Sequence, residues 1–233
     1  MIEECVHFYA DRLRLEGVLT YNEDATASPA ILLCAPHPNL GGDMDNNVIT
    51  GIMRMSADMG FTSLRFNYRG VGNSESHEKD IAQKFQYWEA SLASENYMDA
   101  VTDTQAAIDF LASHINVSGG VFIAGYSFGA IVGMRAGMES NKVAACASIS
   151  TPFGRYNLDF LQRCKKEKLF VYSQNDFAST VEDTLRGFGK VSPPKILELI
   201  QGSDHFYRGQ EDKVSRKVCD FFQRVYKNEI EKG

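Results

Sequence analysis

The sequence has no long uninterrupted run of apolar residues. No stretch approaches the roughly 18 apolar residues that a membrane-spanning helix requires. The first residues, MIEECVHFYADRLRLEG, begin with acidic side chains and contain no apolar core, so we expect no secretory signal there. With 44% hydrophobic and 23% charged residues, the composition is typical of a globular protein with a sizeable core. We therefore expect a cytoplasmic protein without a membrane partner.

Clustered positive charge is also missing. The chain carries 24 lysines and arginines against 30 aspartates and glutamates, which gives a formal net charge of -6. Its basic run CKKEK (164–168) is short. A surface that binds nucleic acid groups Lys and Arg against the phosphates. The sequence therefore predicts no nucleic-acid partner.

The five cysteines form no recognisable pairing or metal-binding motif. Their number is odd, their spacings are wide, and no C-x-x-C occurs. Cys34 and Cys146 fall inside apolar segments, where a free thiol behaves as a small core residue. We expect neither a disulfide framework nor a thiolate zinc site.

The chain does contain a regular alternation of short apolar segments and segments with helical spacing of apolar residues. This alternation predicts an α/β fold, with a mostly parallel eight-stranded sheet and helices on both faces. The two opening segments alternate polar and apolar residues, which predicts an antiparallel hairpin at one edge. The expected strands are 5–10, 13–21, 30–36, 61–68, 120–126, 142–150, 168–173 and 194–201. The expected helices are 46–60, 95–115, 128–140, 158–166, 179–188 and 210–230.

Ser127 stands at the carboxyl end of one expected strand, where such sheets bind ligands. It lies in the pentapeptide GYSFG, between a strand and a helix with no loop in between. Gly125 and Gly129 supply the small residues that so tight a turn needs, which would leave the serine hydroxyl exposed above the sheet. The pentapeptide alone fits an ordinary turn serine equally well.

Two further residues follow later strands. Asp176 comes after strand 168–173, and His205 comes after strand 194–201. Taken singly, Asp176 fits a helix N-cap and His205 fits a surface loop. The order Ser, Asp, His is that of a nucleophile-elbow hydrolase, so the three together favour a catalytic site. We interpret Ser127 as nucleophile, His205 as base and Asp176 as the acid that orients the base.

The loop CAPHPNLGG (34–42) is expected to contribute to an oxyanion hole. Acyl transfer needs backbone N–H donors aimed at the developing oxyanion. Phe128, directly after the nucleophile, supplies one; because proline has no N–H, Asn39 is the best candidate for the other, with Leu40 in reserve. His37 is expected to brace the loop. The spacing in HPNLGGDMD is poor for zinc, and we expect neither a metal nor an organic cofactor.

These motifs resemble those of the α/β-hydrolase superfamily over nearly the whole chain. Within it, the chain is similar to the small, capless bacterial hydrolases related to dienelactone hydrolases and to serine aminopeptidase-like esterases. The resemblance implies an α/β-hydrolase fold without a large cap, and the same three catalytic residues. Dienelactone hydrolases proper usually carry a cysteine nucleophile, so only the scaffold likeness applies to them. The matching stretches are PHPNLGGDMDN, RFNYRGVGNSES, GYSFGA and GSDHFY.

The chain departs from these relatives by an additional segment, ESHEKDIAQKFQYWEASLAS (75–94). Its apolar residues Ile81, Phe85, Trp88 and Leu92 fall on one face of a helix. Two interpretations stay open: a helix packed on the body, or a small lid at 75–97 within an otherwise single domain, 1–233.

Aromatic residues near the strand ends favour an apolar or aromatic acyl group, and Trp88, Phe177 and Phe206 are the expected substrate-binding residues. Arg155 fits either a carboxylate partner or a solvated loop charge.

We predict a serine hydrolase that cleaves a carboxylic ester of a small apolar or aromatic acyl group through an acyl-enzyme. The same residues also suit a thioesterase, a peptidase or amidase, or a C–C bond hydrolase. A non-catalytic binding protein on this fold is a further alternative. A homodimer stays open.

Overall fold

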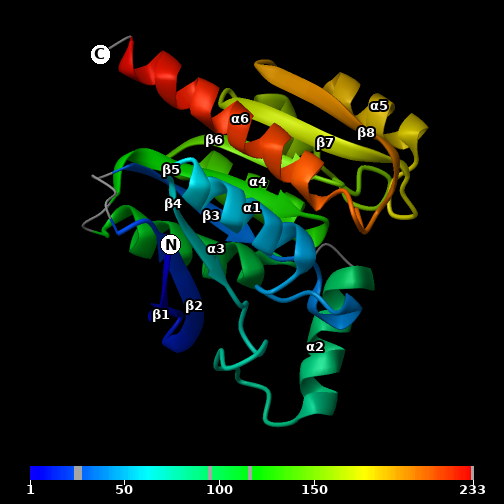
Figure 1. The fold of residues 1–233 in the computed structure, drawn as a ribbon. Coiled ribbons are helices and arrows are strands. Elements are labelled where there is room, and N and C mark those ends of the chain that lie inside the picture. The colour runs from blue at the N-terminus through cyan, green and yellow to red at the C-terminus, as the bar shows by residue number, and fades with distance from the viewer. Residues whose placement is uncertain (24–27, 94–95, 115–116, 232–233) are drawn as a thin grey trace.

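The computed structural model describes residues 1–23, 28–93, 96–114 and 117–231. Its centre is an eight-stranded sheet in the order β1-β2-β4-β3-β5-β6-β7-β8, with helices on both faces (Figure 1). The strands are β1 (Ile2–Ala10), β2 (Leu13–Tyr21), β3 (Ser28–Cys34), β4 (Thr62–Phe66), β5 (Val117–Tyr126), β6 (Val143–Ile149), β7 (Glu167–Asn175) and β8 (Lys195–Asp204). The α-helices are α1 (Asn47–Asp58), α2 (Ile81–Ala93), α3 (Met98–Ala112), α4 (Phe128–Glu139), α5 (Val181–Lys190) and α6 (Glu211–Ile230).

The sheet is antiparallel at one edge and parallel elsewhere. β1 pairs with β2, and β2 pairs with β4, both antiparallel. The pairs from β4 through β3, β5, β6 and β7 to β8 are all parallel. The mostly parallel sheet and its antiparallel edge hairpin are thus confirmed. The carboxyl ends of the parallel strands consequently meet at one side of the sheet.

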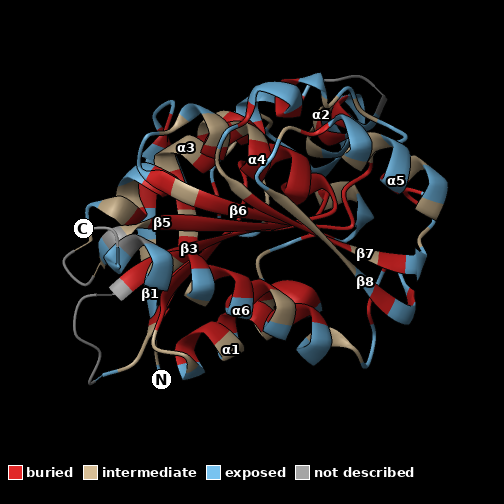
Figure 2. Cartoon of the chain, turned by 90° about the horizontal axis from the view of Figure 1, so that it is seen from above, coloured by how far each residue is buried: buried red, intermediate tan, exposed pale blue. Residues whose placement is uncertain are grey.

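Helices cover both faces of the sheet. α1 and α6 lie on one face, and α2, α3, α4 and α5 lie on the other (Figure 2). The central strands are buried between the two layers, and all five residues of β4 are buried. Strands buried on both faces favour continuous apolar sequence, as in AILLC of β3, although the buried β4 also contains Thr62, Ser63 and Arg65.

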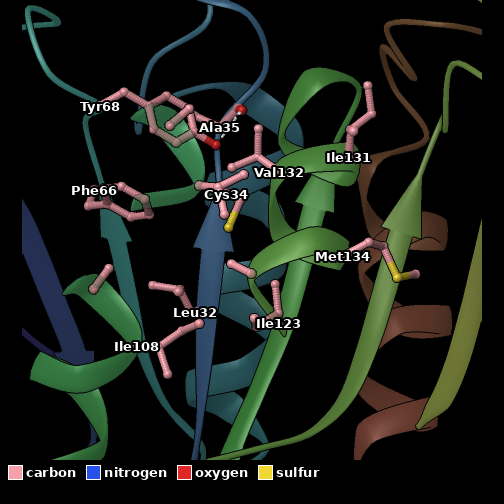
Figure 3. Packing of buried hydrophobic residues seen from close by; sticks show 14 of the residues in the cluster. Leu32, Cys34, Ala35, Phe66, Tyr68, Ile108, Ile123, Ile131, Val132 and Met134 are labelled. Atoms are coloured by element: carbon pink, nitrogen blue, oxygen red, sulfur yellow. Dashed lines mark hydrogen bonds between the residues drawn. The ribbon is translucent and has the colours of Figure 1, made fainter. Parts of the chain in front are cut away.

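The helix after Ser127 lies close against the sheet. Figure 3 shows Val132 of α4 next to Cys34 of β3, and both belong to one buried cluster with Ile123 of β5. A Cβ atom added at Gly133 would lie 2.8 Å from the Ile123 side chain, so glycine is what allows this approach. The close packing holds the amino-terminal end of α4 against the loop after β3.

The helix boundaries differ slightly from those expected. The expected helix 158–166 is a short 3-10 helix, η2 (Asp159–Arg163), and another 3-10 turn, η1 (Pro38–Leu40), follows β3. The expected helix 95–115 corresponds to α3; residues 95 and 115 lie outside the described residues. The additional segment (75–94) contains α2. Its residue 94, and residue 95 of the possible lid at 75–97, also lie outside the described residues.

Candidate active site

Ser127 sits in a sharp reversal between β5 and α4. Its backbone has φ 56° and ψ −114°, a conformation that residues other than glycine rarely adopt. The Ser127 N–H donates to the Ile149 carbonyl at 2.8 Å, which fixes the turn to β6. A Cβ at Gly125 would overlap the backbone of Gly129, so the strand and helix can meet only because glycine is present. This turn holds the Ser127 side chain at the carboxyl edge of the sheet.

Ser127, His205 and Asp176, which lie at the ends of β5, β8 and β7, form one hydrogen-bonded chain. His205 Nε2 lies 3.1 Å from Ser127 Oγ, and His205 Nδ1 lies 2.7 Å from Asp176 Oδ1. An ionised Asp176 accepts a hydrogen bond from Nδ1–H, which leaves Nε2 as an acceptor facing the serine hydroxyl. The structure therefore brings together the three residues that the strand ends indicated.

The Asp176 carboxylate is held by further donors. The Ala178 N–H donates to Oδ1 at 2.8 Å, and the Ser173 hydroxyl donates to Oδ2 at 3.2 Å. Burial opposes ionisation of Asp176, but hydrogen bonds, first of all from His205, outweigh it and lower the pKa of the carboxyl. Asp176 is consequently charged at neutral pH and can orient His205.

His205 itself is fixed from two sides. The Tyr126 hydroxyl donates to the His205 carbonyl oxygen at 2.7 Å. The Phe177 ring lies against the imidazole, with 4.5 Å between the ring centroids. These contacts limit the movement of the ring, and that keeps Nε2 directed toward Ser127.

The candidate oxyanion donors differ in their present hydrogen bonds. Phe128 is the first residue of α4, a position whose N–H has no partner within the helix. The Asn39 N–H donates to His37 Nδ1 at 3.1 Å. The Leu40 N–H donates to the His37 carbonyl at 3.0 Å. Both amides that the sequence suggested in the loop are thus bonded within that loop.

His37 is buried and uncharged. Its Nε2 lies 2.8 Å from the Ser91 hydroxyl, which itself donates to the Trp88 carbonyl at 2.7 Å. Nε2 is therefore the donor to Ser91, and Nδ1 is free to accept from Asn39. Burial lowers the pKa of His37 to about 4. The ring is a structural support of the loop and contacts the Phe128 ring at 4.9 Å between centroids.

α2 packs on this loop through part of its expected apolar face. Trp88 is 3% exposed and contacts His37, Tyr68 and Phe128, whereas Ile81 and Phe85 are 87% and 50% exposed. The side-chain amide of Asn39 also donates to the Phe85 carbonyl at 2.8 Å. Ile81 and Phe85 thus face solvent. Of the four apolar residues expected on this face, Trp88 is the one that is fully buried against the body of the protein.

A pocket of about 180 Å³ opens beside Ser127. Phe177, one of the three expected substrate-binding residues, is 55% exposed and forms part of its wall. Trp88 supports Phe128 from behind and does not line the pocket. Phe206 stands next to Phe177, 5.8 Å between centroids, outside the lining. The lining residues are His37, Leu40, Leu92, Ser127, Phe128, Pro152, Arg155, Tyr156, Phe177 and Ala178.

Ser91 is a residue of the site that sequence reasoning missed. It connects α2 to His37, and the Tyr156 hydroxyl donates to its carbonyl at 3.3 Å. A serine within a helical segment has no local sequence pattern that predicts contacts with residues as distant as His37 and Tyr156. The apolar spacing of α2 was the nearest available signal.

Among the residues that the structure describes, no helix is both long and apolar enough to cross a bilayer.

Comparisons with known proteins point to one fold. No family model matches the chain. An uncharacterized protein of Rickettsia prowazekii is 27% identical over 231 residues, covering 96% of this chain and 90% of the relative.

Solved structures are similar over almost the full length. A candidate alpha/beta hydrolase of unknown function from Agrobacterium tumefaciens has a TM-score of 0.79 at 25% identity, covering 97% of this chain and 98% of the other. An alpha-beta serine hydrolase homologue from Coxiella burnetii has a TM-score of 0.79 at 24% identity, with 94% and 97% covered. A serine hydrolase without a lid from Xanthomonas campestris has a TM-score of 0.78 at 19% identity, with 95% and 94% covered.

These neighbours share an alpha/beta hydrolase fold with this chain over almost its full length. The eight-stranded sheet, its helical layers and the direct passage from β6 through a short segment to β7 leave no large cap domain among the described residues. The chain has the α/β-hydrolase fold in its capless form, the fold that it shares with these solved structures.

Proposed function

We propose that the protein is a serine hydrolase that cleaves carboxylic esters of small acyl groups through an acyl-enzyme. The observation that carries this proposal is the hydrogen-bonded chain Ser127–His205–Asp176 at the side of a pocket. A turn serine needs no histidine beside it, and a surface histidine needs no buried carboxylate. The arrangement is the one that nucleophilic catalysis by serine requires.

In the first half of the reaction, Ser127 Oγ attacks the ester carbonyl carbon while its proton passes to His205 Nε2. Asp176 stabilises the resulting imidazolium through Nδ1. The carbonyl oxygen becomes an oxyanion, and when it collapses the carbon–oxygen bond to the alcohol breaks. The leaving alkoxide takes the proton from His205, and the acyl group stays on Ser127.

In the second half, water repeats the attack. His205 accepts a proton from the water, whose oxygen bonds to the acyl carbon. The tetrahedral species collapses, Ser127 Oγ leaves and recovers its proton from His205, and the carboxylic acid is released. The chain's own side chains account for every proton transfer.

The oxyanion is the point at which the loop geometry matters. The Phe128 N–H, unpaired within α4, is the first donor in this proposal. For Asn39 to be the second donor, its N–H must be shared between His37 Nδ1 and the oxyanion. The reserve, Leu40, would have to give up its bond to the His37 carbonyl.

The pocket suits a short acyl chain. Its volume of about 180 Å³ is below the range of pockets that enclose drug-sized ligands. Leu40, Leu92, Phe128 and Phe177 provide much of the wall as apolar surface. Thioesters and amides require the same catalytic groups, so the choice of ester over these is tested with a substrate panel.

The test combines a probe for an activated serine with a substrate panel. A fluorophosphonate probe is expected to label the wild type and not Ser127→Ala. p-Nitrophenyl esters of graded acyl length, an aryl thioester and an aminoacyl anilide are assayed in parallel, with short esters expected to be the best substrates.

Ser113→Ala is the matched control, because Ser113 is an exposed serine at the end of α3. It is expected to label and to turn over like the wild type. A folded wild type that neither labels nor hydrolyses any ester would refute the proposal and favour a binding protein.

A further inference from the structure

Arg155 is the pocket residue whose role the proposed chemistry leaves unassigned. It lies in the segment after β6, where its backbone N–H donates to the Pro152 carbonyl at 3.1 Å. Its guanidinium lies beside Phe177: Cζ is 5.9 Å from the ring centroid, and Nη2 is 3.4 Å from the Phe177 carbonyl oxygen. This hydrogen bond is long, so most of the donor capacity of the guanidinium is left over.

No carboxylate in the described parts of the chain uses that capacity. Among the residues that the structure describes, no aspartate or glutamate forms an ion pair with Arg155. By contrast, Arg65, Arg69, Arg135 and Arg186 each pair with at least one acid. A free guanidinium at the wall of a pocket can bind an anion without breaking an existing ion pair.

The pocket wall has the opposite charge from the molecule as a whole. The protein has a formal net charge of -6, yet none of the described residues that line the pocket is acidic. Arg155 is the one charged residue of this described lining, because His37, buried with a pKa of about 4, is neutral there. The amino-terminal end of α4, at Phe128, adds a partial positive charge on the same wall.

We propose that Arg155 binds a carboxylate carried by the substrate, so that the pocket selects esters that contain an acid group. This inference rests on the proposed ester hydrolysis and specifies its substrate class. Arginine binds a carboxylate with two parallel N–H donors, and the Phe177 ring holds the guanidinium in place for it. Because the pocket is small, the acid group lies a few carbons from the ester, as in a monoester of a short dicarboxylic acid.

Three esters test this selection. p-Nitrophenyl butyrate is neutral, mono-p-nitrophenyl glutarate carries its carboxylate on the acyl chain, and 4-butyryloxybenzoate carries it on the alcohol. In Arg155→Met, the ratio of kcat/KM for a charged ester to that for the neutral ester is expected to fall about 10- to 100-fold, mainly through KM. A fall with the glutarate ester places the acid group on the acyl side, and a fall with the benzoate places it on the alcohol side.

Two more variants separate a specific contact from a general effect of charge. Arg155→Lys keeps the charge but loses the paired donors, and is expected to recover only part of the ratio. Arg208→Met is the matched control, because Arg208 also lies over an aromatic ring, Phe206 at 5.3 Å, but outside the pocket lining. Two results would show that Arg155 is not a specificity residue. In one, Arg155→Met changes the kcat/KM ratio of each charged ester to the neutral ester by less than twofold; in the other, Arg208→Met changes these ratios as much as Arg155→Met does.

A binding measurement keeps this inference distinct from the proposed catalysis. Mono-p-nitrophenyl glutarate is titrated calorimetrically into Ser127→Ala and into Ser127→Ala with Arg155→Met. The second protein is expected to bind about 10-fold or more weakly. Equal affinities overturn the role of Arg155 even if the wild type is an active esterase. Weaker binding supports that role even if the hydrolysis assay refutes the proposed function.

Discussion

The imidazole Nε2 of His37 lies 2.8 Å from the hydroxyl of Ser91, 54 residues later in the chain. This hydrogen bond connects the loop after β3 to α2, the helix of the additional segment. On the loop side, the same imidazole accepts the Asn39 N–H through Nδ1. The position of a candidate oxyanion donor therefore depends on a helix that lies far from it in sequence.

Removing the Ser91 hydroxyl is expected to destabilise the protein. In Ser91→Ala, the buried His37 Nε2–H loses its acceptor, which costs about 1–3 kcal/mol in the free energy of unfolding. Urea denaturation of the variant against the wild type measures this loss. Ser113→Ala, whose hydroxyl is exposed, is expected to change the free energy by less than about 0.5 kcal/mol. Equal stabilities of Ser91→Ala and wild type would show that the His37–Ser91 bond is not formed in solution.

The neutral state of His37 makes stability depend on pH. Its pKa of about 4 in the folded protein lies below the ordinary value of 6.5, so the unfolded chain binds this proton more readily. The stability contributed by neutral His37 is complete above pH 6.5 and is lost as the pH falls toward 4. The difference between these two pKa values of His37 corresponds to about 3 kcal/mol in the free energy of unfolding.

The measurement is the free energy of unfolding at pH 7.5 and at pH 4.5. The wild type is expected to lose more stability over this interval than His37→Gln, which has no proton to take up. His77→Gln serves as the control because His77 is exposed, and it should follow the wild type. Parallel losses in wild type and His37→Gln would contradict the buried, neutral imidazole.

Asp176→Asn is expected to reduce catalysis while preserving the shape of the site. The amide cannot stabilise the imidazolium and favours the wrong tautomer of His205, so kcat should fall about 10³- to 10⁴-fold. Hydrolysis of p-nitrophenyl butyrate measures the fall, with the exposed Asp159→Asn as control. A variant that retains more than about a tenth of wild-type kcat would remove Asp176 from the proposed mechanism.

Two glycine substitutions should act in opposite directions. In Gly129→Ala, the new methyl group would overlap the carbonyl oxygens of Cys34 and Ala35, so the turn at Ser127 must shift. We expect a loss of about 1–3 kcal/mol or more and a large loss of esterase activity. Gly189 lies in α5 with no atom near the added methyl group, and Gly189→Ala should stabilise by about 0.5–1 kcal/mol. Thermal denaturation of both variants decides whether the close approach at Gly129 is obligatory.

The sequence was sufficient for the sheet and for the three residues at its strand ends. Most of the buried parallel strands are recognisable as short apolar segments, and the residues that follow such strands meet at one edge of the sheet. Ser127, Asp176 and His205 could therefore be assigned to one site from the sequence alone. The hydrogen bonds of the loop 34–42 were harder to predict. The partner of the Asn39 N–H depends on the rotamer of His37, which the sequence pattern does not encode.

The additional segment shows a second kind of difficulty. The spacing of Ile81, Phe85, Trp88 and Leu92 indicated a helix with one apolar face, and a helix is found there. Periodicity shows which side chains share a face but not how much of that face meets the body. Here α2 inserts Trp88 and leaves Ile81 and Phe85 in solvent.

β8 is one of the two edge strands of the sheet and pairs with β7 alone. His205 directly follows this edge strand, whereas Ser127 directly follows the interior strand β5, so the proposed base and the proposed nucleophile depend on different parts of the sheet. An edge strand can detach by local opening, which requires less free energy than unfolding of the whole domain. We therefore expect heating or denaturant to abolish the proposed activity before the whole sheet unfolds.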